Sequence, residues 1–408
     1  MHSPHAIALR KLFSRKTLPR RGCTLARIVL CNVAGIAAAA LYLLAVAPGA
    51  KADEDTFLPK LRIGEEAFFE VYGQLNKGFL LYDDGDGALL FPLVDNSNSS
   101  TRFGWRAGAP VTGSIDVGVN FEFQWTPYST GTVNRANRTD PSFAKDETTL
   151  LRNYEAWVDS GTLGKLSVGQ GSMASDGTAE ADLSGTNVVA YSSVGDLAGG
   201  QFLRANGTAS TVQIKDAFDN LDGLARRLRV RYDTPGFAGF SAGASFGTTI
   251  VRDRLHDTLW DVSLRYRGEI GGVRVVGAAA YAQANDTNDD LFSGSFSALH
   301  SSGFNLTFAG GHQDKDGVAA NPGYGYAKLG YSYRFLDAGE SAFAIDYYRG
   351  EDFANNGSTS QSFGATVVQN LDYYRTEVYL GFRLYNYDVP GTNYEDGWGV
   401  LTGARIRF

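Results

Sequence analysis

The sequence is poor in cysteine: it holds two, Cys23 and Cys31, and none follows residue 31. Small exported domains usually depend on disulfides, because they cannot bury a sufficient core. A chain whose main body lacks cysteine must be stabilised by its own hydrogen-bonded framework. This excludes a small disulfide-stapled secreted domain and favours a large sheet protein.

Long apolar runs are also missing after Ala47, where no uncharged segment approaches the 18 or so residues of a membrane-spanning helix. The mean hydropathy is −0.19, while Gly (49), Phe (25) and Tyr (21) are abundant. A helical membrane protein is therefore excluded. Composition alone leaves open a membrane barrel, a soluble β-sandwich and a propeller.

The N-terminal segment differs from the rest. Residues 1–27 carry seven lysines and arginines and no acid, residues 28–47 are uncharged, and Ala50-Lys51-Ala52 follows. This is typical of a secretory signal peptide cut after Ala52. A retained helical anchor is the alternative, but the small residues at 50–52 favour cleavage. We expect residues 1–52 to be a signal peptide for the Sec pathway, 53–65 a lead-in and 66–408 the folded domain.

Positive charge is scarce in residues 53–408. The first 52 residues hold eight of the 37 lysines and arginines and none of the 44 acids, which leaves 29 bases against 44 acids. Such an acidic balance argues against nucleic acid as a partner.

Period-two alternation is the strongest positive signal. The last strand alternates Trp398, Val400, Thr402, Ala404, Ile406 and Phe408 with Gly399, Gly403, Arg405 and Arg407. Sixteen such segments are predicted. They are 69–82, 99–109, 114–125, 149–160, 164–171, 225–234, 239–249, 257–268, 272–283, 293–300, 303–313, 325–335, 341–350, 360–369, 374–387 and 397–408.

A soluble sandwich would alternate in the same way, so the lengths of the connections must distinguish it from a membrane barrel. Short links such as 109–113, 160–163 and 268–271 alternate with longer polar ones such as 83–98, 127–148 and 314–324. Short turns on one side and long loops on the other are typical of outer-membrane barrels, where only a closed sheet pairs all backbone groups in lipid. We predict an all-β, 16-stranded antiparallel transmembrane barrel with both ends in the periplasm and a water-filled lumen rather than a packed core.

The longest connection, 172–224, lacks a sustained period and is predicted to fold into the barrel as a constriction. Acids on this loop opposite arginines on the wall would set a transverse field across the aqueous path. The alternatives are solvated loop charges for the acids and interstrand salt bridges for the arginines. The predicted constriction residues are Asp176, Glu180, Asp182, Arg102, Arg106, Arg152, Arg227, Arg229 and Arg231.

Signals for other chemistry are weak. Gly243–Gly247 matches a nucleophile-elbow pattern but lies within an alternating strand with no helix after it, and no Ser-His pair converges, so we expect no enzyme. Asp84 and Asp86 would bind calcium weakly at an external loop, without the distal glutamate of a complete site. Otherwise no cofactor is expected.

Two rival functions stay open beside a general diffusion channel. A substrate-specific channel would need an aromatic track, for which Tyr324, Tyr326, Tyr347, Tyr348, Tyr373 and Tyr374 are candidates. A barrel acting as an adhesin or enzyme is the other. The sequence does not give the sign of the preferred ion, because arginines and acids both line the predicted constriction.

The domain resembles the trimeric general porins of Gram-negative bacteria, most closely those of α-proteobacteria. Five motifs carry the resemblance, in the family's order: VYGQLNKGF (71–79), DNSNSSTRFGWR (95–106), GTLGKLSVGQG (161–171), RLRVRYDTPGFAGFSAG (227–243) and GARIRF (403–408).

This resemblance implies passive diffusion of small hydrophilic solutes through a homotrimer in the outer membrane, with Arg102, Asp176 and Glu180 at eyelet positions. At Gln74 the sequence departs from relatives that carry a basic residue after YG, and on the fourth strand Arg152 and Tyr154 are both candidates. The resemblance also implies a trimer contact through the early strands, the last strand and the 127–148 loop. It further implies recognition of Phe408 by the barrel-assembly machinery.

Overall fold

The computed structural model describes residues 61–63, 67–138, 149–251, 254–284, 289–317 and 320–408. The chain divides into two units, Met1–Pro48 and Gly49–Phe408, and every described residue belongs to the second. The predicted signal peptide, most of the lead-in and part of the 127–148 loop lie outside the described residues. No helix among the described residues is long and apolar enough to cross a membrane.

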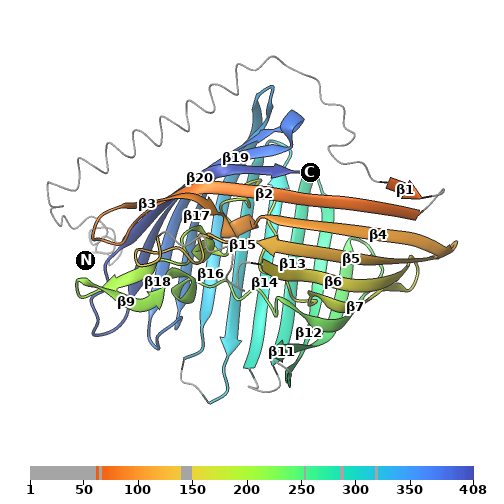
Figure 1. Ribbon diagram of the computed structural model, residues 1–408, viewed down its shortest axis with the longest axis horizontal. Coiled ribbons are helices and arrows are strands. Elements are labelled where there is room, and N and C mark those ends of the chain that lie inside the picture. The colour runs from red at the N-terminus through yellow and green to blue at the C-terminus, as the bar shows by residue number, and fades with distance from the viewer. Residues whose placement is uncertain (1–60, 64–66, 139–148, 252–253, 285–288, 318–319) are drawn as a thin grey trace, which may run out of the picture. The chain divides into compact units, whose positions relative to one another are not determined.

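Within these residues, sixteen antiparallel strands close into a barrel (Figure 1). The first barrel strand, β2, pairs with β4 through its first half and with the last strand, β20, through its second half. Every other barrel strand pairs with its neighbour along the chain, and β7 pairs with β10 across the long connection. The strands are β2 (Ala67–Asp83), β4 (Arg102–Thr112), β5 (Ile115–Trp125), β6 (Thr149–Ser160), β7 (Gly164–Ser172), β10 (Arg226–Asp233), β11 (Phe240–Val251), β12 (Arg254–Ile270), β13 (Val273–Ala284), β14 (Asp289–His300), β15 (Phe304–Asp314), β16 (Gly323–Leu336), β17 (Gly339–Glu351), β18 (Thr359–Leu371), β19 (Thr376–Asp388) and β20 (Gly397–Arg407).

Alternation places the two kinds of side chain as predicted. On β5, Val119 and Phe123 face outward and are over one-third exposed, while Glu122 between them is buried on the inner side. The fold class and the sixteen segments are thereby confirmed, with β6 matching its predicted bounds.

Two further strands in the same sheet were not predicted. β1 (Leu61–Ile63) pairs with the start of β2, and β3 (Leu89–Asp95) pairs with its second half. The sequence assigned 83–98 to a polar connection. β3 contains Pro92 and a left-handed Leu93 (φ 55°), and its register on β2 shifts at a bulge, so it carries no regular period.

The segment between β7 and β10, residues 173–225, is the constriction loop. It contains a 3₁₀ turn η3 (Val194–Leu197), a two-stranded hairpin of β8 (Phe202–Ala205) and β9 (Thr208–Gln213), and a short helix α3 (Ile214–Ala217). The hairpin lies against the loop between β19 and β20, where the Asn206 amide donates to the Asn393 carbonyl at 2.9 Å. The loop is therefore a small folded element rather than an irregular one.

The middle of the constriction loop buries an apolar core against the inner faces of β16–β20 and the second half of β2, which we call the packed wall. Val189, Leu197 and Phe218 of the loop share this core with wall residues such as Leu80 and Tyr385. The Phe218 ring lies 5.1 Å from that of Tyr385, edge to face. Contact is close enough that the wall needs glycine: a Cβ on Gly381 would stand 2.8 Å from Val189, and one on Gly399 2.9 Å from Leu197.

This core corrects the prediction of a lumen without a packed interior. Tyr324, Tyr326 and Tyr348 point inward but are buried in the core, so they offer no aromatic track to a solute. Tyr347 is outward and exposed, and Tyr373 and Tyr374 lie in the β18–β19 turn. The inward tyrosines are on the lumen side because the loop needs an apolar surface there.

Candidate constriction site

Three arginines stand on alternate strands, at the level of the barrel where the constriction loop begins. Arg102 opens β4, Arg152 lies near the start of β6, and Arg226 opens β10. We call the inner faces of β4–β7 together with Arg226 the charged wall. The pairing of β5 with β6 shifts register after Glu122, and Arg152 lies in that irregularity with its side chain on the inner side. Tyr154, the other candidate on this strand, faces outward and is 64% exposed.

A single carboxylate holds two of these arginines in place. Arg152 Nε donates to Glu122 Oε1 at 2.6 Å, and its Nη1 donates to Gln124 Oε1 at 2.7 Å. Arg102 Nη1 lies 4.0 Å from the same Glu122 oxygen. Two guanidiniums sharing one carboxylate leave a net positive charge at this level of the wall.

The position where the sequence departs from its relatives has a structural role of its own. Gln74 is buried, and its Nε2 donates to the carbonyls of Ser100 at 2.7 Å and Ser99 at 3.2 Å. A neighbouring strand supplies the positive charge instead: Arg405 of β20 donates from Nη1 to Ser99 Oγ at 2.6 Å. Gln74 thus supports the turn that leads into Arg102.

The acids lie on the two limbs of the constriction loop. Asp176 Oδ2 is 3.4 Å from Arg226 Nη2, a direct contact between loop and wall. Asp222, on the returning limb, accepts from the backbone amides of Gly177 at 2.8 Å and Ala179 at 2.9 Å. Glu180 accepts from Asn220 Nδ2 at 3.4 Å. These bonds hold the outgoing and returning limbs together, so three carboxylates share one small region.

Crowding and burial change how these acids titrate. Burial, with the nearby carboxylates of Asp222, Asp196 and Asp176, raises the pKa of Glu180 well above its usual range. Burial also raises the pKa of Asp222 to about 6, against the opposing effect of the Ala179 amide bond. The charge of the loop therefore changes within the physiological pH range.

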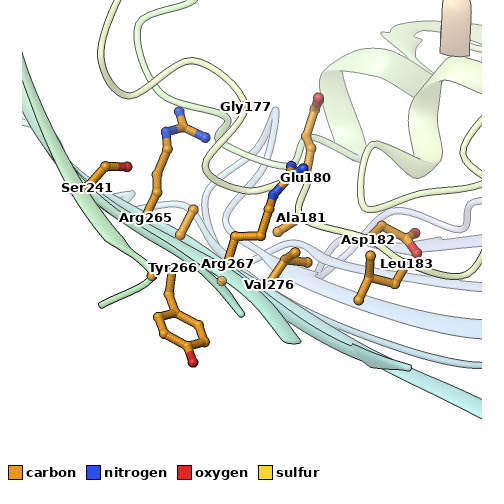
Figure 2. Close-up of a pocket in the computed structure, with 13 residues that line it drawn as sticks. Gly177, Glu180, Ala181, Asp182, Leu183, Ser241, Arg265, Tyr266, Arg267 and Val276 are labelled. Carbon is orange, nitrogen blue, oxygen red and sulfur yellow. The ribbon is translucent and has the colours of Figure 1, made fainter. Parts of the chain in front are cut away.

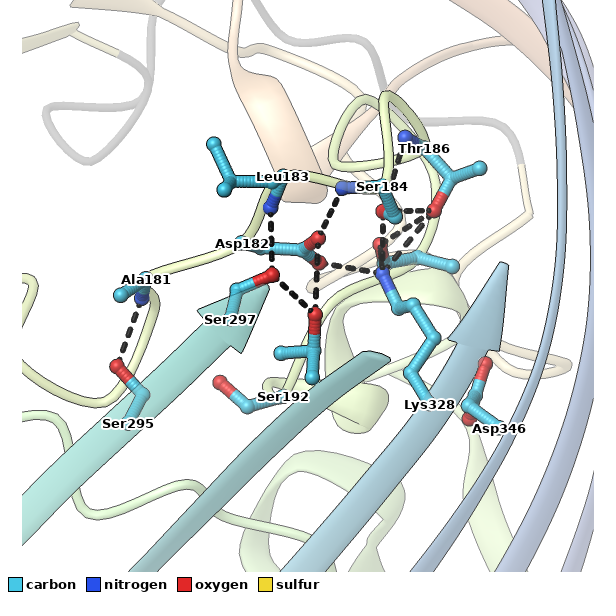
Figure 3. A network of polar contacts seen from close by, with 12 residues as sticks. Ala181, Asp182, Leu183, Ser184, Thr186, Ser192, Ser295, Ser297, Lys328 and Asp346 are labelled. Carbon is cyan, nitrogen blue, oxygen red and sulfur yellow. Dashed lines mark hydrogen bonds and ion pairs between the residues drawn. The ribbon is translucent and has the colours of Figure 1, made fainter. Parts of the chain in front are cut away.

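Asp182, the third predicted acid, lies elsewhere (Figure 3). Its carboxylate binds Lys328 Nζ of β16 at 2.5 Å, and the two side chains are 2% and 0% exposed. Lys328 also donates to the Ala190 carbonyl at 2.7 Å, and the Leu183 amide donates to Ser297 Oγ at 2.9 Å. Asp182 therefore anchors the loop to the packed wall, with its carboxylate buried.

Several predicted arginines also act as anchors or pair locally. Arg229 is buried, pairs with Glu155 and donates to the Ser172 carbonyl at 3.0 Å, while Arg231 pairs with Asp233 at 2.8 Å and donates to the Met173 carbonyl at 2.8 Å. They hold the start of the loop rather than forming the constriction. Arg106 forms a two-bond pair with Glu70, at 2.9 and 3.0 Å, further toward the short turns, and Arg227 donates to the Arg226 carbonyl at 2.9 Å.

At the rim of the barrel that carries the long loops, the β8–β9 hairpin is connected by polar contacts to three of these loops. The Glu395 amide donates to the Arg204 carbonyl at 2.9 Å, and Arg204 forms ion pairs with Asp86 at 3.2 Å and Asp84 at 3.6 Å. Arg135 binds Asp84 at 2.8 Å. The acids that suggested a calcium site are thus in contact with arginines.

Sequence reasoning missed Arg226, Arg405 and Asp222. Arg226 directly precedes the predicted Arg227 and is the first residue of β10, so only its contact with Asp176 shows which arginine meets the loop. Asp222 lies in a segment without periodicity. Arg405 could have been found, because the alternation of the last strand already placed it on the polar face.

The comparisons with known proteins agree with this fold. The family model for the Gram-negative porins matches residues 30–390. Among solved structures, the chain is similar to the anion-selective porin from Comamonas acidovorans, at 16% identity and a TM-score of 0.56 over 84% of this chain and 100% of that one. It is also similar to outer-membrane expressed OmpT of Vibrio cholerae, at 13% identity and a TM-score of 0.54 over 86% of this chain and 100% of that one. The structure of Salmonella typhi OmpF in complex with daunomycin is similar at 14% identity and a TM-score of 0.52, over 85% of this chain and 99% of that one. The comparison with curated protein sequences finds no match.

A closed sixteen-stranded barrel with a loop folded against its inner wall defines a channel protein of the outer membrane. The chain belongs to the Gram-negative porin family. It forms an outer-membrane channel for the passive diffusion of small hydrophilic solutes, as the sequence predicted. The substrate-specific, adhesin and enzyme alternatives are not favoured.

Proposed function

We propose that solutes pass between the charged wall and the constriction loop. The narrowest part would lie between Arg102, Arg152 and Arg226 on one side and Asp176, Glu180 and Asp222 on the other. One observation carries this proposal: among these six residues the three bases lie on strands and the three acids lie on the loop. They meet directly at the 3.4 Å contact of Asp176 with Arg226.

Such a separation of charge selects by dipole as well as by size. Positive and negative groups across an aqueous gap produce a transverse field, in which a hydrated polar solute orients and keeps favourable contacts on both sides. An apolar solute gains nothing from the field and must displace bound water. The channel would therefore favour small, hydrophilic and zwitterionic molecules.

Reversal potentials test this assignment. In a planar bilayer with a salt gradient, Asp176→Asn should shift the reversal potential toward anion preference, and Arg152→Gln should shift it toward cation preference. Glu351→Gln is the control, because Glu351 lies at the end of β17, paired with Arg349 and 61% exposed. Equal potentials for all three variants and the wild type would contradict the proposed constriction.

We also propose that the protein is a homotrimer, with the outer face of β2–β6 in the interface. Trp105, Phe121 and Tyr154 form an aromatic cluster there, with ring separations of 5.4 and 5.7 Å. Lys77 lies between the exposed Leu75 and Phe79 on the same face and pairs with Asp95 at 2.6 Å. A lysine at mid-membrane facing lipid costs about 2–4 kcal/mol, so a protein surface is the better neighbour. A solved trimer form of V. cholerae OmpT shares the fold, with a TM-score of 0.53.

Cross-linking in mild detergent tests the trimer. A ladder ending at three subunits is expected, together with conductance steps in groups of three. A single monomer band with single steps would refute it.

Phe408 is proposed to be the signal read by the barrel-assembly machinery after export by the Sec pathway. It also has a role in the fold, since its amide donates to the Gly73 carbonyl at 3.1 Å and its own carbonyl accepts from the Gly73 amide at 2.9 Å. The two roles can be separated. A variant lacking Phe408 should refold in detergent from urea yet fail to assemble in cells, whereas normal assembly in cells would exclude recognition.

The proposed activity includes no catalysis. Ser245, the serine of the elbow-like motif, donates to Asp261 and accepts from the Ala174 amide at 2.9 Å. It is an anchor for the constriction loop. A serine-directed fluorophosphonate should leave the protein unlabelled, and stoichiometric labelling of Ser245 would contradict this reading.

A further inference from the structure

A cavity of about 430 Å³ lies between residues 177–183 of the constriction loop and the inner wall of β11–β13 (Figure 2). Two arginines of β12, Arg265 and Arg267, line it together with Ser241 and Glu180. Binding sites for small molecules commonly have volumes of roughly 300–1,000 Å³, so this cavity has room for a small solute. It lies nearer the short turns than the Arg102, Arg152 and Arg226 group does.

The first arginine is fixed by the loop. Arg265 Nη2 donates to the carbonyls of Asp176 at 2.7 Å and Ala174 at 3.1 Å. These two bonds use one nitrogen, and no carboxylate lies within ion-pair distance of Arg265 in the described part of the chain. Its charge is therefore positioned but not neutralised.

The second arginine, Arg267, lies two residues on, on the same face of β12. It is exposed, and among the described residues no hydrogen bond or ion pair is formed by its side chain. Figure 2 shows both side chains rising from the strand toward the loop. By contrast, Arg106, Arg152, Arg226, Arg229, Arg231 and Arg405 of the lumen each pair with a carboxylate.

Two acids, Glu180 and Asp182, line the cavity, and Asp182 is paired with Lys328 at 2.5 Å. Of the acids nearby, Asp176 contacts Arg226, and Asp222 accepts two backbone amides of the loop. Burial and neighbouring carboxylates raise the pKa of Glu180 well above its usual range. The Ser241 hydroxyl, which also lines the cavity, can donate to an anion.

We propose that this cavity is a subsite for small oxyanions, solutes that carry a carboxylate or phosphate group, which they occupy after passing the constriction. Two guanidiniums on one face present the forked donors that match such groups, and an anion between them relieves their mutual repulsion. This inference rests on the proposed path along the charged wall and adds a solute class to it.

Saturation of conductance tests the subsite. The full-length mature porin would be placed in planar bilayers with potassium acetate, potassium phosphate or potassium chloride. Arg267→Gln should raise the half-saturating concentration of acetate and phosphate roughly two- to fivefold, as expected for one exposed charge contact. The spherical chloride ion should be affected less.

Arg274→Gln is the matched control. Arg274 lies on the inner face of β13, is exposed, forms no ion pair among the described residues and does not line this cavity. Its half-saturating concentrations should equal those of the wild type. A change confined to acetate would assign carboxylates, and a change confined to phosphate would assign phosphates.

Two results would overturn the subsite: equal behaviour of Arg267→Gln and the wild type, or equal effects of Arg267→Gln and Arg274→Gln in all three salts. Failure of the proposed constriction is a different result. It would appear as unchanged reversal potentials in Asp176→Asn and Arg152→Gln, whatever Arg267→Gln does.

Discussion

The packed wall and the charged wall are built from strands with the same alternation, yet the inner face of one is buried beneath the loop and the inner face of the other keeps exposed charges. On the packed wall, Tyr348, Tyr385 and Leu401 are buried beneath the constriction loop. On the charged wall, Arg102 and Arg152 keep 25% and 15% of their side chains exposed, and Asp116 is exposed. The contrast shows that a lumen-facing position is not always a water-facing one. The loop decides which half of the interior becomes core.

Removing the buried cation of the packed wall should have the largest effect. Lys328→Met leaves the Asp182 carboxylate buried without a cation to pair with, which costs about 3–5 kcal/mol. The guanidinium midpoint in detergent measures this loss. The double variant Lys328→Met/Asp182→Leu should recover part of it, because no unpaired charge remains. A single variant as stable as the wild type would mean that the packed wall does not depend on this pair.

Truncation of one core ring sharpens the comparison. Phe218→Ala removes a 1% exposed side chain between the loop and the packed wall and should cost about 3–5 kcal/mol. Phe246→Ala, on the outward face of β11 and 58% exposed, should cost clearly less. The same unfolding measurement compares the two variants. Equal losses would indicate that Phe218 contributes only general hydrophobicity.

Asp222 gives the smallest effect, a change of selectivity with pH. Its pKa of about 6 means that it is mostly ionised at pH 7 and mostly neutral at pH 5. Acidification therefore removes negative charge from the loop and should shift the reversal potential toward anion preference. In Asp222→Asn the component with a midpoint near pH 6 should be absent. Its persistence would assign the titration to another group.

Strands could be predicted because each one separates two solvents. β6 has an apolar outer face and a polar inner face, and its alternation gave its bounds of Thr149–Ser160. β3 could not be found in this way, since Pro92 and Leu93 interrupt its period and its pairing depends on a bulge in β2.

The site was only partly predictable, because the sequence shows which residues are charged but not which residue each of them pairs with. Asp176 and Asp182 look equivalent in the loop, but Lys328, far along the chain, buries one of them. A lysine on the same face as Tyr324 and Tyr326 was the available signal. Arg226 meets the loop acid and Arg229 anchors the loop, a division that depends on the path of the loop and that the alternation of β10 does not predict.

The glycines of β19 and β20 set a limit on engineering this channel. Gly381 and Gly399 lie where Val189 and Leu197 press against the barrel, at 2.8 and 2.9 Å from where a Cβ would be. A pore segment transplanted from a relative would meet a surface moulded for other side chains. Chimaeras that alter permeation must therefore exchange the inner residues of β19 and β20 together with the transplanted loop segment.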